Sequence, residues 1–167
     1  KRSAELRRLA AGISVTLERA HWSVAKQFIK EHYKKASGVE QSAHWWVACR
    51  PDNFDEVVGV VGVVWCENNV RGKREHRVIV ASHLQGNGLG TRISDAVAEL
   101  YHSQGWAYMS IFHHLRLAQH RQASPLWEAL PSNLAEEAKK VRYAFQYVGK
   151  QAMASSKAAA RQGGLCG

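Results

Sequence analysis

The feature that most constrains this chain is a glycine-rich loop between two apolar segments. Residues 78–93 read VIVASHLQGNGLGTRI, with Gly86, Gly88 and Gly90 falling within five positions. The β-branched start predicts a strand, and the apolar spacing over 87–104 predicts an amphipathic helix. Glycines allow backbone N–H groups to approach a ligand closely, and the start of a helix favours an anion. The stretch therefore predicts a phosphate-binding loop.

The order of residues in the loop narrows the class of phosphate. A dinucleotide site would need G-x-G-x-x-G and a later acidic strand, and a P-loop would need Lys-Ser/Thr. Residues 85–90 instead follow Q-x-x-G-x-G. With its flanking strand and helix, this motif resembles the acyl-CoA pyrophosphate loop of the GNAT superfamily of acyltransferases. The alternative is a turn that only caps the helix, with Asn87 as the N-cap.

The rest of the chain supplies an element order similar to that family from Gly12 to Gly149. No element is assigned over 113–121, and Ser124 to Leu130 is expected to be a short helix beginning near Pro125. The expected strands are 12–18, 43–50, 57–66, 75–82, 106–112 and 141–148, and the expected helices are 21–33, 87–104 and 124–130. The resemblance implies an α/β (α+β) fold with a mixed central sheet, splayed after the strand that feeds the glycine loop and flanked by helices.

Length and composition fit one globular domain. The chain has 167 residues, of which 46% are hydrophobic and 22% charged, as is typical of a soluble protein. We expect a single acyltransferase domain over 1–150 and a basic tail rich in Ala, Ser and Gly over 151–167. The absence of a long apolar run or an apolar leader predicts a cytoplasmic protein with no membrane partner. Three cysteines without a C-x-x-C pair fit a reducing compartment, and no metal site is expected.

The charge is strongly and unevenly positive. The net charge is +9, and six Lys or Arg but no acidic residue follow position 138. Residues 71–77 (RGKREHR) and the N-terminal segment form two further basic clusters. Such asymmetry predicts a polyanionic partner, and a nucleic acid such as DNA or tRNA fits best. The alternative is a basic, solvated surface, part of which serves the phosphates of CoA.

The resemblance also implies which residues hold acetyl-CoA or a related acyl-CoA. Backbone groups of Ile79 and Val80 would pair with the pantetheine arm like an added strand, and an N–H near Val80 would polarise the thioester carbonyl. Amides of the loop would hold the pyrophosphate. The implied cofactor-binding residues are Ile79, Val80, Gln85, Gly86, Asn87, Gly88, Leu89, Gly90 and Thr91.

The catalytic residues are less clearly marked. Many relatives keep a base in the strand that feeds the loop, where this chain has Glu75 and His76. The other interpretation is that Glu75 only offsets its basic neighbours. Relatives often carry a tyrosine as general acid in the helix after the splayed strand, but Trp127 stands near that place here. Ser124 is the candidate substitute, unless no acid is needed.

Two further patterns resemble a GNAT subgroup carried by phages and mobile elements, which includes Mom-type adenine-modifying proteins. One is the pair His32 and Tyr33 at the end of the first helix, and the other is the aromatic final strand with Tyr147. In this interpretation the three residues line the acceptor side, where an aromatic ring would stack on a base. Ordinary packing of aromatic side chains is the alternative.

These features predict an acyl-CoA-dependent N-acyltransferase that transfers an acetyl-type group to an amine on a nucleic acid. Two alternatives within the fold are acetylation of a small amine or a protein, and a GNAT-fold nucleic-acid-binding module that has lost catalysis. A nucleic-acid-binding protein that merely resembles the family is a third. A splayed sheet often recruits a second subunit, so a homodimer is a further alternative to a monomer.

Overall fold

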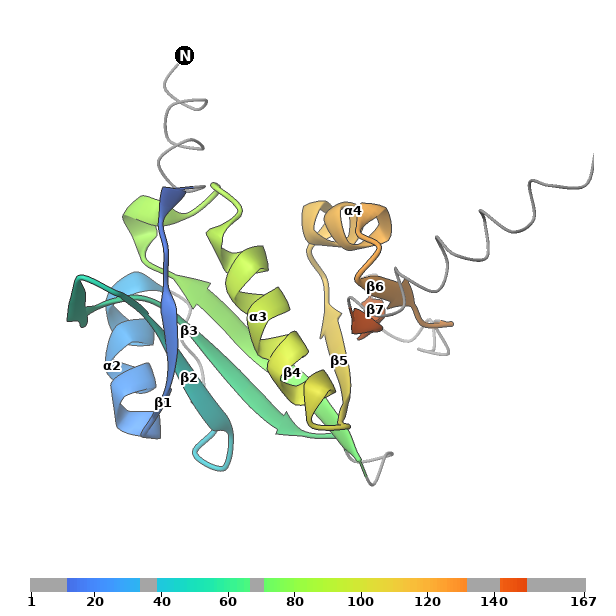
Figure 1. Ribbon diagram of the computed structural model, residues 1–167, viewed down its shortest axis with the longest axis horizontal. Coiled ribbons are helices and arrows are strands. Elements are labelled where there is room, and N and C mark those ends of the chain that lie inside the picture. The colour runs from blue at the N-terminus through green and yellow to red at the C-terminus, as the bar shows by residue number, and fades with distance from the viewer. Residues whose placement is uncertain (1–11, 34–38, 67–70, 132–141, 150–167) are drawn as a thin grey trace, which may run out of the picture.

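The computed structural model describes residues 12–33, 39–66, 71–131 and 142–149 (Figure 1). The elements in chain order are β1 (Thr16–Ala20), α2 (Trp22–His32), β2 (His44–Arg50), β3 (Asn53–Trp65), β4 (Gly72–Val80), the 3-10 turn η1 (Ser82–Leu84), α3 (Leu89–Ser103), β5 (Ala107–Phe112), α4 (Leu115–Ala123), β6 (Trp127–Ala129) and β7 (Tyr143–Tyr147). The seven strands form one sheet in the order β1-β2-β3-β4-β5-β7-β6.

The sheet opens between β4 and β5. All neighbouring strands are antiparallel except this parallel pair. The β4–β5 ladder begins at Gly72 and stops where Glu75 faces Ser110, whereas β4 stays paired with β3 as far as Val80. Figure 1 shows the two strands diverging beyond that point. The expected mixed, splayed sheet flanked by helices is therefore confirmed.

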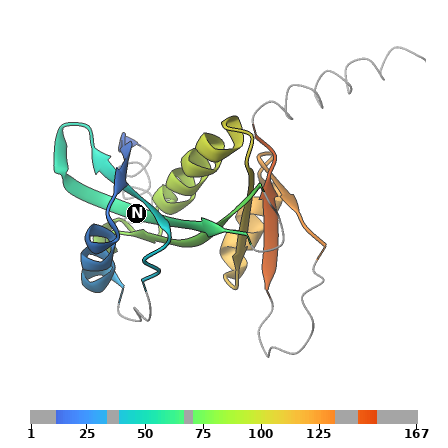
Figure 2. The ribbon, with the colours of Figure 1, turned by 90° about the horizontal axis from the view of Figure 1, so that it is seen from below.

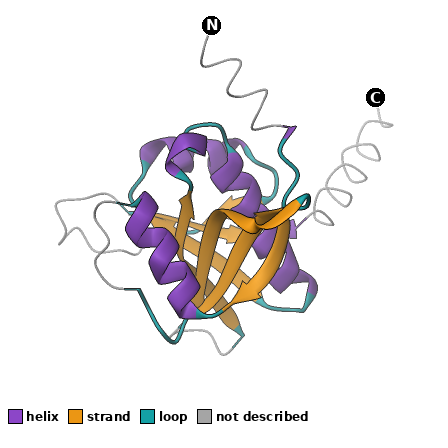
Figure 3. Ribbon diagram, turned by 90° about the vertical axis from the view of Figure 1, so that its left-hand side faces the viewer, coloured by secondary structure: helices purple, strands orange, loops and turns teal. Residues whose placement is uncertain are grey.

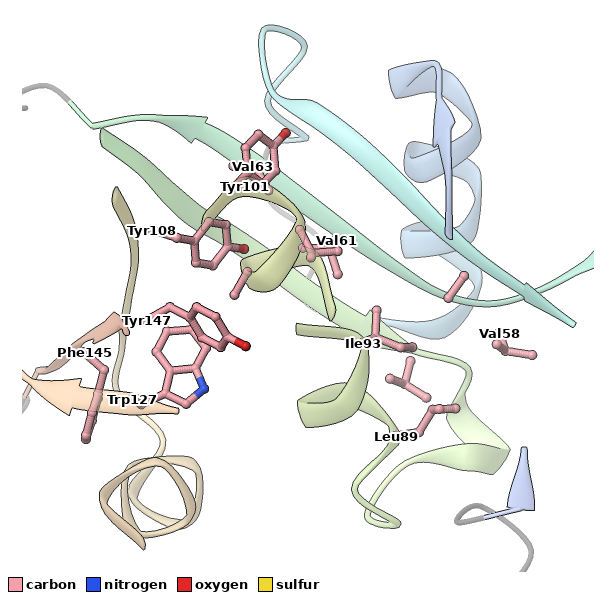
Figure 4. Close-up of a cluster of buried hydrophobic side chains, with 14 of the residues drawn as sticks. Val58, Val61, Val63, Leu89, Ile93, Tyr101, Tyr108, Trp127, Phe145 and Tyr147 are labelled. Carbon is pink, nitrogen blue, oxygen red and sulfur yellow. The ribbon is translucent and has the colours of Figure 1, made fainter. Parts of the chain in front are cut away.

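Helices cover both faces of the sheet and create two buried clusters. Figure 2 shows α2 and α3 on opposite faces, and Figure 3 shows helices on both sides of the strands. Val60 of β3 packs with Ile29 of α2, whereas Val61 packs with Ile93 of α3 (Figure 4). The nearly continuous apolar run of β3 follows from this, because a strand covered on both faces needs apolar residues at successive positions.

The expected helix from Ser124 to Leu130 is wrong. The chain forms α4 earlier, over the segment that had no assignment, and then the strand β6, in which Trp127 pairs with Tyr147 of β7. Pro125 accounts for the change, since the residue before a proline is pushed out of the helical region. Ser124 accordingly has extended angles, φ −89° and ψ 126°, and ends α4.

Some other boundaries also differ from expectation. The first strand begins at Thr16 rather than near Gly12, and the N-cap of α3 is Gly88 rather than Asn87. The expected tail 151–167 lies outside the described residues, as does all of the basic C-terminal cluster except Arg142. Among the described helices, none has the length and apolar character needed to cross a membrane.

Candidate functional site

The glycine loop presents backbone amides at the start of α3. Gly86 and Gly88 both have φ of +80°, in the left-handed region that glycine adopts without strain. The amide of Arg92 donates to the carbonyl of Gly88 at 3.2 Å. The amides of residues 89–91 precede it in the first turn and have no partner within the helix. The positive end of the helix dipole lies at the same place, so the loop is built to hold an anion.

Side chains of the loop stabilise the loop itself. Gly90 brings α3 close to β4, because a Cβ at this position would lie 3.3 Å from the Val80 side chain. Three side-chain amides or hydroxyls donate to nearby carbonyls: Gln85 Nε2 to Val80 (2.9 Å), Asn87 Nδ2 to Leu84 (3.5 Å) and Thr91 Oγ1 to Gly88 (2.7 Å). The backbone amides of the loop are thereby left to face a ligand.

A pocket of about 370 Å³ runs from this loop to the point where the sheet opens. It brings together many of the residues expected to bind acyl-CoA with one expected acceptor-side residue, Tyr33. Its lining consists of Gln85, Gly86, Gly90 and Thr91 of the loop and α3, Ser94 of α3, Glu75, Val78, Ile79 and Val80 of β4, His114, Leu117 and Arg121 at α4, Leu84 and Tyr33. The distance along β4 from Val80 to Glu75 is about 17 Å, five residues of extended chain.

A buried ion pair closes the deep end of this pocket. Glu75 is 6% exposed and Arg121 1% exposed. Arg121 Nη2 donates to Glu75 Oε1 at 3.1 Å, and Ser110 Oγ donates to the same oxygen at 2.7 Å. Ser94 Oγ and, at 3.4 Å, Tyr108 OH donate to Oε2. Each carboxylate oxygen therefore accepts two donors, which fills its capacity.

The guanidinium of Arg121 is also held by aromatic rings. Its central carbon lies 3.8 Å from the ring centroid of Trp127 and 5.1 Å from that of Phe112. The indole N–H of Trp127 donates to Asp95 at 2.8 Å, and burial raises the pKa of that carboxyl. Trp127 thus packs against the guanidinium of the buried ion pair. It belongs to the strand β6 and not to α4, the helix that faces the pocket.

A bulge in β4 sets the position of His76. The β3–β4 register shifts between Arg77 and Glu75, so His76 is the extra residue. Its ring packs edge-on to Trp45 on the α2 face, with centroids 6.2 Å apart. Among the described residues, its buried Nε2 has no hydrogen-bond partner. Burial first, and then the charges of Arg77 and Arg74, lower the pKa of His76, so the ring is neutral at pH 7.

The end of α2 meets the turn that follows β4. Tyr33 is the C-cap of α2 and lines the pocket. His32 Nδ1 accepts from the amide of Ser82 at 3.3 Å and lies 3.2 Å from its Oγ. Because Nδ1 is an acceptor, the neutral ring carries its proton on Nε2. His32 is therefore set up to donate a hydrogen bond at Nε2.

Three of the expected catalytic residues lie outside the pocket lining, namely His32, Tyr147 and Ser124. Tyr147 is 1% exposed and donates to Glu99 at 2.7 Å, and Figure 4 shows it beside Trp127 and Phe145. Stacking of Tyr147 on an acceptor base is wrong, because its ring is covered. Burial and the Glu99 carboxylate raise the pKa of Tyr147. Ser124 Oγ accepts from the amide of Leu126 at 3.4 Å at the end of α4.

The sequence interpretation missed Arg121 and Ser94. The segment containing Arg121 had no assigned element, and Ser94 was read only as part of a helix. A weak signal was present, since His114, Leu117 and Arg121 recur at spacings of three and four and line one face of α4.

Several solved structures with a similar fold are acetyltransferases. A spermidine/spermine N-acetyltransferase from Vibrio cholerae matches with a TM-score of 0.58 at 9% identity, covering 79% of this chain and 91% of its own. A ribosomal-protein alanine N-acetyltransferase from Escherichia coli matches with a TM-score of 0.56 at 6% identity, covering 80% and 93%. An IAA acetyltransferase from Bacillus cereus matches with a TM-score of 0.55 at 16% identity, covering 80% and 99%. At these identities the likeness concerns the fold.

An open sheet whose departing strand feeds an anion-binding glycine loop defines the class of acyltransferases that use an acyl-CoA. The sequence profile of the acetyltransferase (GNAT) family matches residues 13–130. The chain belongs to this family and is an acyltransferase, and the family uses acetyl-CoA or another acyl-CoA as co-substrate. A search of curated protein sequences found no match.

Proposed function

We propose that this protein transfers an acetyl-type group from acetyl-CoA to an amine carried on a nucleic acid, either a DNA base or tRNA. The observation that carries the choice of acceptor is the charge of the pocket. Glu75 is the only acidic residue of its described lining, and Arg121 already neutralises it. A small cationic amine would find no free carboxylate there, whereas a chain of net charge +9 attracts a polyanion.

The residues present fit a CoA group. The unpaired amides at the start of α3 and the positive-φ glycines Gly86 and Gly88 suit a pyrophosphate. Beyond Glu75, the β5-facing edge of β4 has no partner among the described strands, so Ile79 and Val80 would hold the pantetheine arm. When bound, acetyl-CoA supplies the activated thioester; the protein supplies orientation and a place for the proton.

In this proposal His76 accepts the proton of the acceptor amine. Glu75 was one expected base, but its oxygens are fully occupied, whereas His76 is neutral and its Nε2 has no partner in the part of the chain that the structure describes. The bulge places the backbone of His76 directly after Glu75, where β4 leaves β5, while its ring packs on Trp45 outside the described pocket lining. Glu75 and Arg121 then hold the deep end of the pocket, while His32 and Tyr33 form part of the acceptor side.

The narrower family assignment and the domain limits also remain proposals. The link to phage-borne, Mom-type proteins is supported by Tyr33 at the pocket and by His32 beside it. The buried Tyr147 gives it no support. We propose one catalytic domain over 1–150, followed by a basic tail.

The test is an acceptor panel. Release of CoA thiol from acetyl-CoA is measured with DNA, tRNA, spermidine and a peptide amine, followed by mass spectrometry of the nucleosides. We expect thiol release and an acetyl mass shift with a nucleic acid. Turnover of spermidine or the peptide without any nucleoside mass shift would show that the acceptor is wrong.

The proton acceptor is tested separately. His76→Gln is compared with His120→Gln, an exposed histidine of α4 outside the pocket. We expect the first to lower kcat by about a hundredfold with little change in KM for acetyl-CoA, and the second to leave both unchanged. Equal kcat in the two variants would exclude His76.

A further inference from the structure

A second pocket, of about 320 Å³, lies at the far end of α3 and combines cations with aromatic rings. We call it the basic-aromatic pocket; its principal residues are Arg19, Trp46, Trp65, Lys73, Tyr101 and Trp106. From Gly88 to Gln104, which also lines it, α3 rises about 24 Å. The basic-aromatic pocket is therefore separate from the glycine loop and from the opening of the sheet.

Lys73 is a buried cation without an anionic partner. It is 2% exposed, and its Nζ lies 3.1 Å from the ring centroid of Trp65, 4.9 Å from that of Trp106 and 6.0 Å from that of Tyr101. Within the described residues it makes no hydrogen bond or ion pair. Aromatic faces attract an ammonium but do not replace a counter-ion, so an anion placed beside Lys73 would complete the arrangement.

Arg19 brings a second positive charge to the same space. It lies exposed on β1, with its guanidinium carbon 5.2 Å from the ring centroid of Trp46. After burial, the charge of Arg19 is the next cause that lowers the pKa of Lys73, and it also lowers that of His44. The described lining contains no acidic residue. Two cations therefore face one cavity that has no carboxylate among its described residues.

The aromatic wall offers an open face. Trp65 is 54% exposed, although it packs edge-on to Trp106 with centroids 5.2 Å apart. Unpaired bases stack on aromatic rings, while Lys and Arg neutralise the phosphates of the same nucleotides. A large indole exposed to this extent beside two cations therefore suits an unpaired nucleotide. A simple anion would have no use for the exposed ring.

We propose that the basic-aromatic pocket binds a nucleotide unit, with its phosphate between Arg19 and Lys73 and its base stacked on Trp65. The inference deepens the proposed function and rests on it for the nature of the partner. Two sources share this chemistry, a free nucleotide and one nucleotide of an unpaired strand.

The test measures binding without acyl transfer. Fluorescence anisotropy of a labelled single-stranded oligonucleotide is recorded at several salt concentrations, with a mononucleotide and inorganic phosphate as competitors. The variants are Arg19→Gln, Lys73→Gln and Trp65→Ala. The matched control is Lys26→Gln. Lys26 also lies over an aromatic ring, 5.3 Å from the ring centroid of Trp22 on α2. Its substitution therefore removes the same charge, but from outside the pocket.

We expect Arg19→Gln and Lys73→Gln each to weaken binding about tenfold and to reduce the salt slope by about one. Trp65→Ala should weaken it by about tenfold or more, and Lys26→Gln by less than about twofold. Tighter binding of the oligonucleotide than of the mononucleotide identifies a strand as the ligand, and equal affinity identifies the free nucleotide.

Three results would overturn the inference. One is an affinity for Arg19→Gln equal to that for Lys26→Gln; Arg19 is exposed on an edge strand, so its loss should leave the fold intact. Another is competition by inorganic phosphate as strong as by the mononucleotide. The third is binding of the oligonucleotide and of the mononucleotide that continues unchanged in all three pocket variants; acetylation of a nucleic acid by these variants would then leave the proposed function standing. Binding that depends on the pocket, without acetylation of any nucleic acid, would keep the inference and reject the proposed acceptor.

Discussion

The buried pair formed by Glu75 and Arg121 allows a quantitative test of how the open sheet is held together. The pair joins β4 to α4 across the point where β4 leaves β5, and Ser94 of α3 bonds to both partners. We consider Glu75→Gln, Arg121→Met and the double variant. Each single change leaves one charge buried without its partner, whereas the double change removes both.

The expected size follows from burial. The two side chains are 6% and 2% exposed, and breaking a buried pair on one side costs about 3–5 kcal/mol. The double variant leaves no uncompensated charge, so its loss should be about as large as that of one single variant rather than their sum. The coupling free energy between Glu75 and Arg121 is then about 3–5 kcal/mol. The cation–π contact with Trp127 cancels from it, because Arg121→Met and the double variant both lose that contact.

Urea unfolding followed by circular dichroism gives the four free energies of unfolding. The control cycle uses Arg50 and Asp52, an exposed pair at 3.2 Å with side chains 41% and 69% exposed, for which we expect almost no coupling. Coupling at Glu75 and Arg121 as small as in this control would refute the reasoning. The same variants test the expected base, because a folded Glu75→Gln protein that keeps its kcat excludes proton transfer by Glu75.

Three further expectations concern single features. Gly88→Val should abolish acetyl-CoA binding in calorimetry, whereas Gly105→Val, with the same positive φ after α3 and open space around it, should only lose stability; equal binding by both would contradict the loop assignment. His76 and His44 have lowered pKa values, so the unfolded chain takes up their protons first, and the melting temperature should fall as pH drops below about 6.5; a flat or rising profile would count against this. Tyr147→Phe should lower the free energy of unfolding by about 1 kcal/mol, because the hydrogen bond to Glu99 is lost, and should leave kcat unchanged. A large fall in kcat would show that Tyr147 takes part in catalysis.

The features that the sequence predicted correctly depend on neighbours along the chain. The glycine loop between a strand and a helix follows from residues that all lie within 78–104. Gly105, with φ of +81°, ends the helix as its sequence position suggests. The apolar run over 57–66 likewise falls in the strand expected there, which is β3. Such signals are local, and the structure changes only their boundaries.

The features that the sequence did not predict depend on distant partners. Arg121 is 46 positions from Glu75, and nothing in the pattern around either residue indicates the other. Basic neighbours led to the expectation that Glu75 offsets adjacent charges, yet its counter-charge comes from α4. The strand at Trp127 likewise depends on pairing with Tyr147 of β7, and helix propensity without this partner gave the wrong element.

The two ends of helix α3 differ in how they would bind an anion, and this explains why the cations of the basic-aromatic pocket matter at its far end. At its start, unpaired amides and the positive end of the dipole attract an anion without help, so the loop needs glycines rather than lysines. At its end, the carbonyls are partly negative and repel an anion. Binding a phosphate there requires side-chain cations, and Lys73 and Arg19 stand at that end. Replacing glycines should therefore affect only the first ligand, and replacing cations only the second.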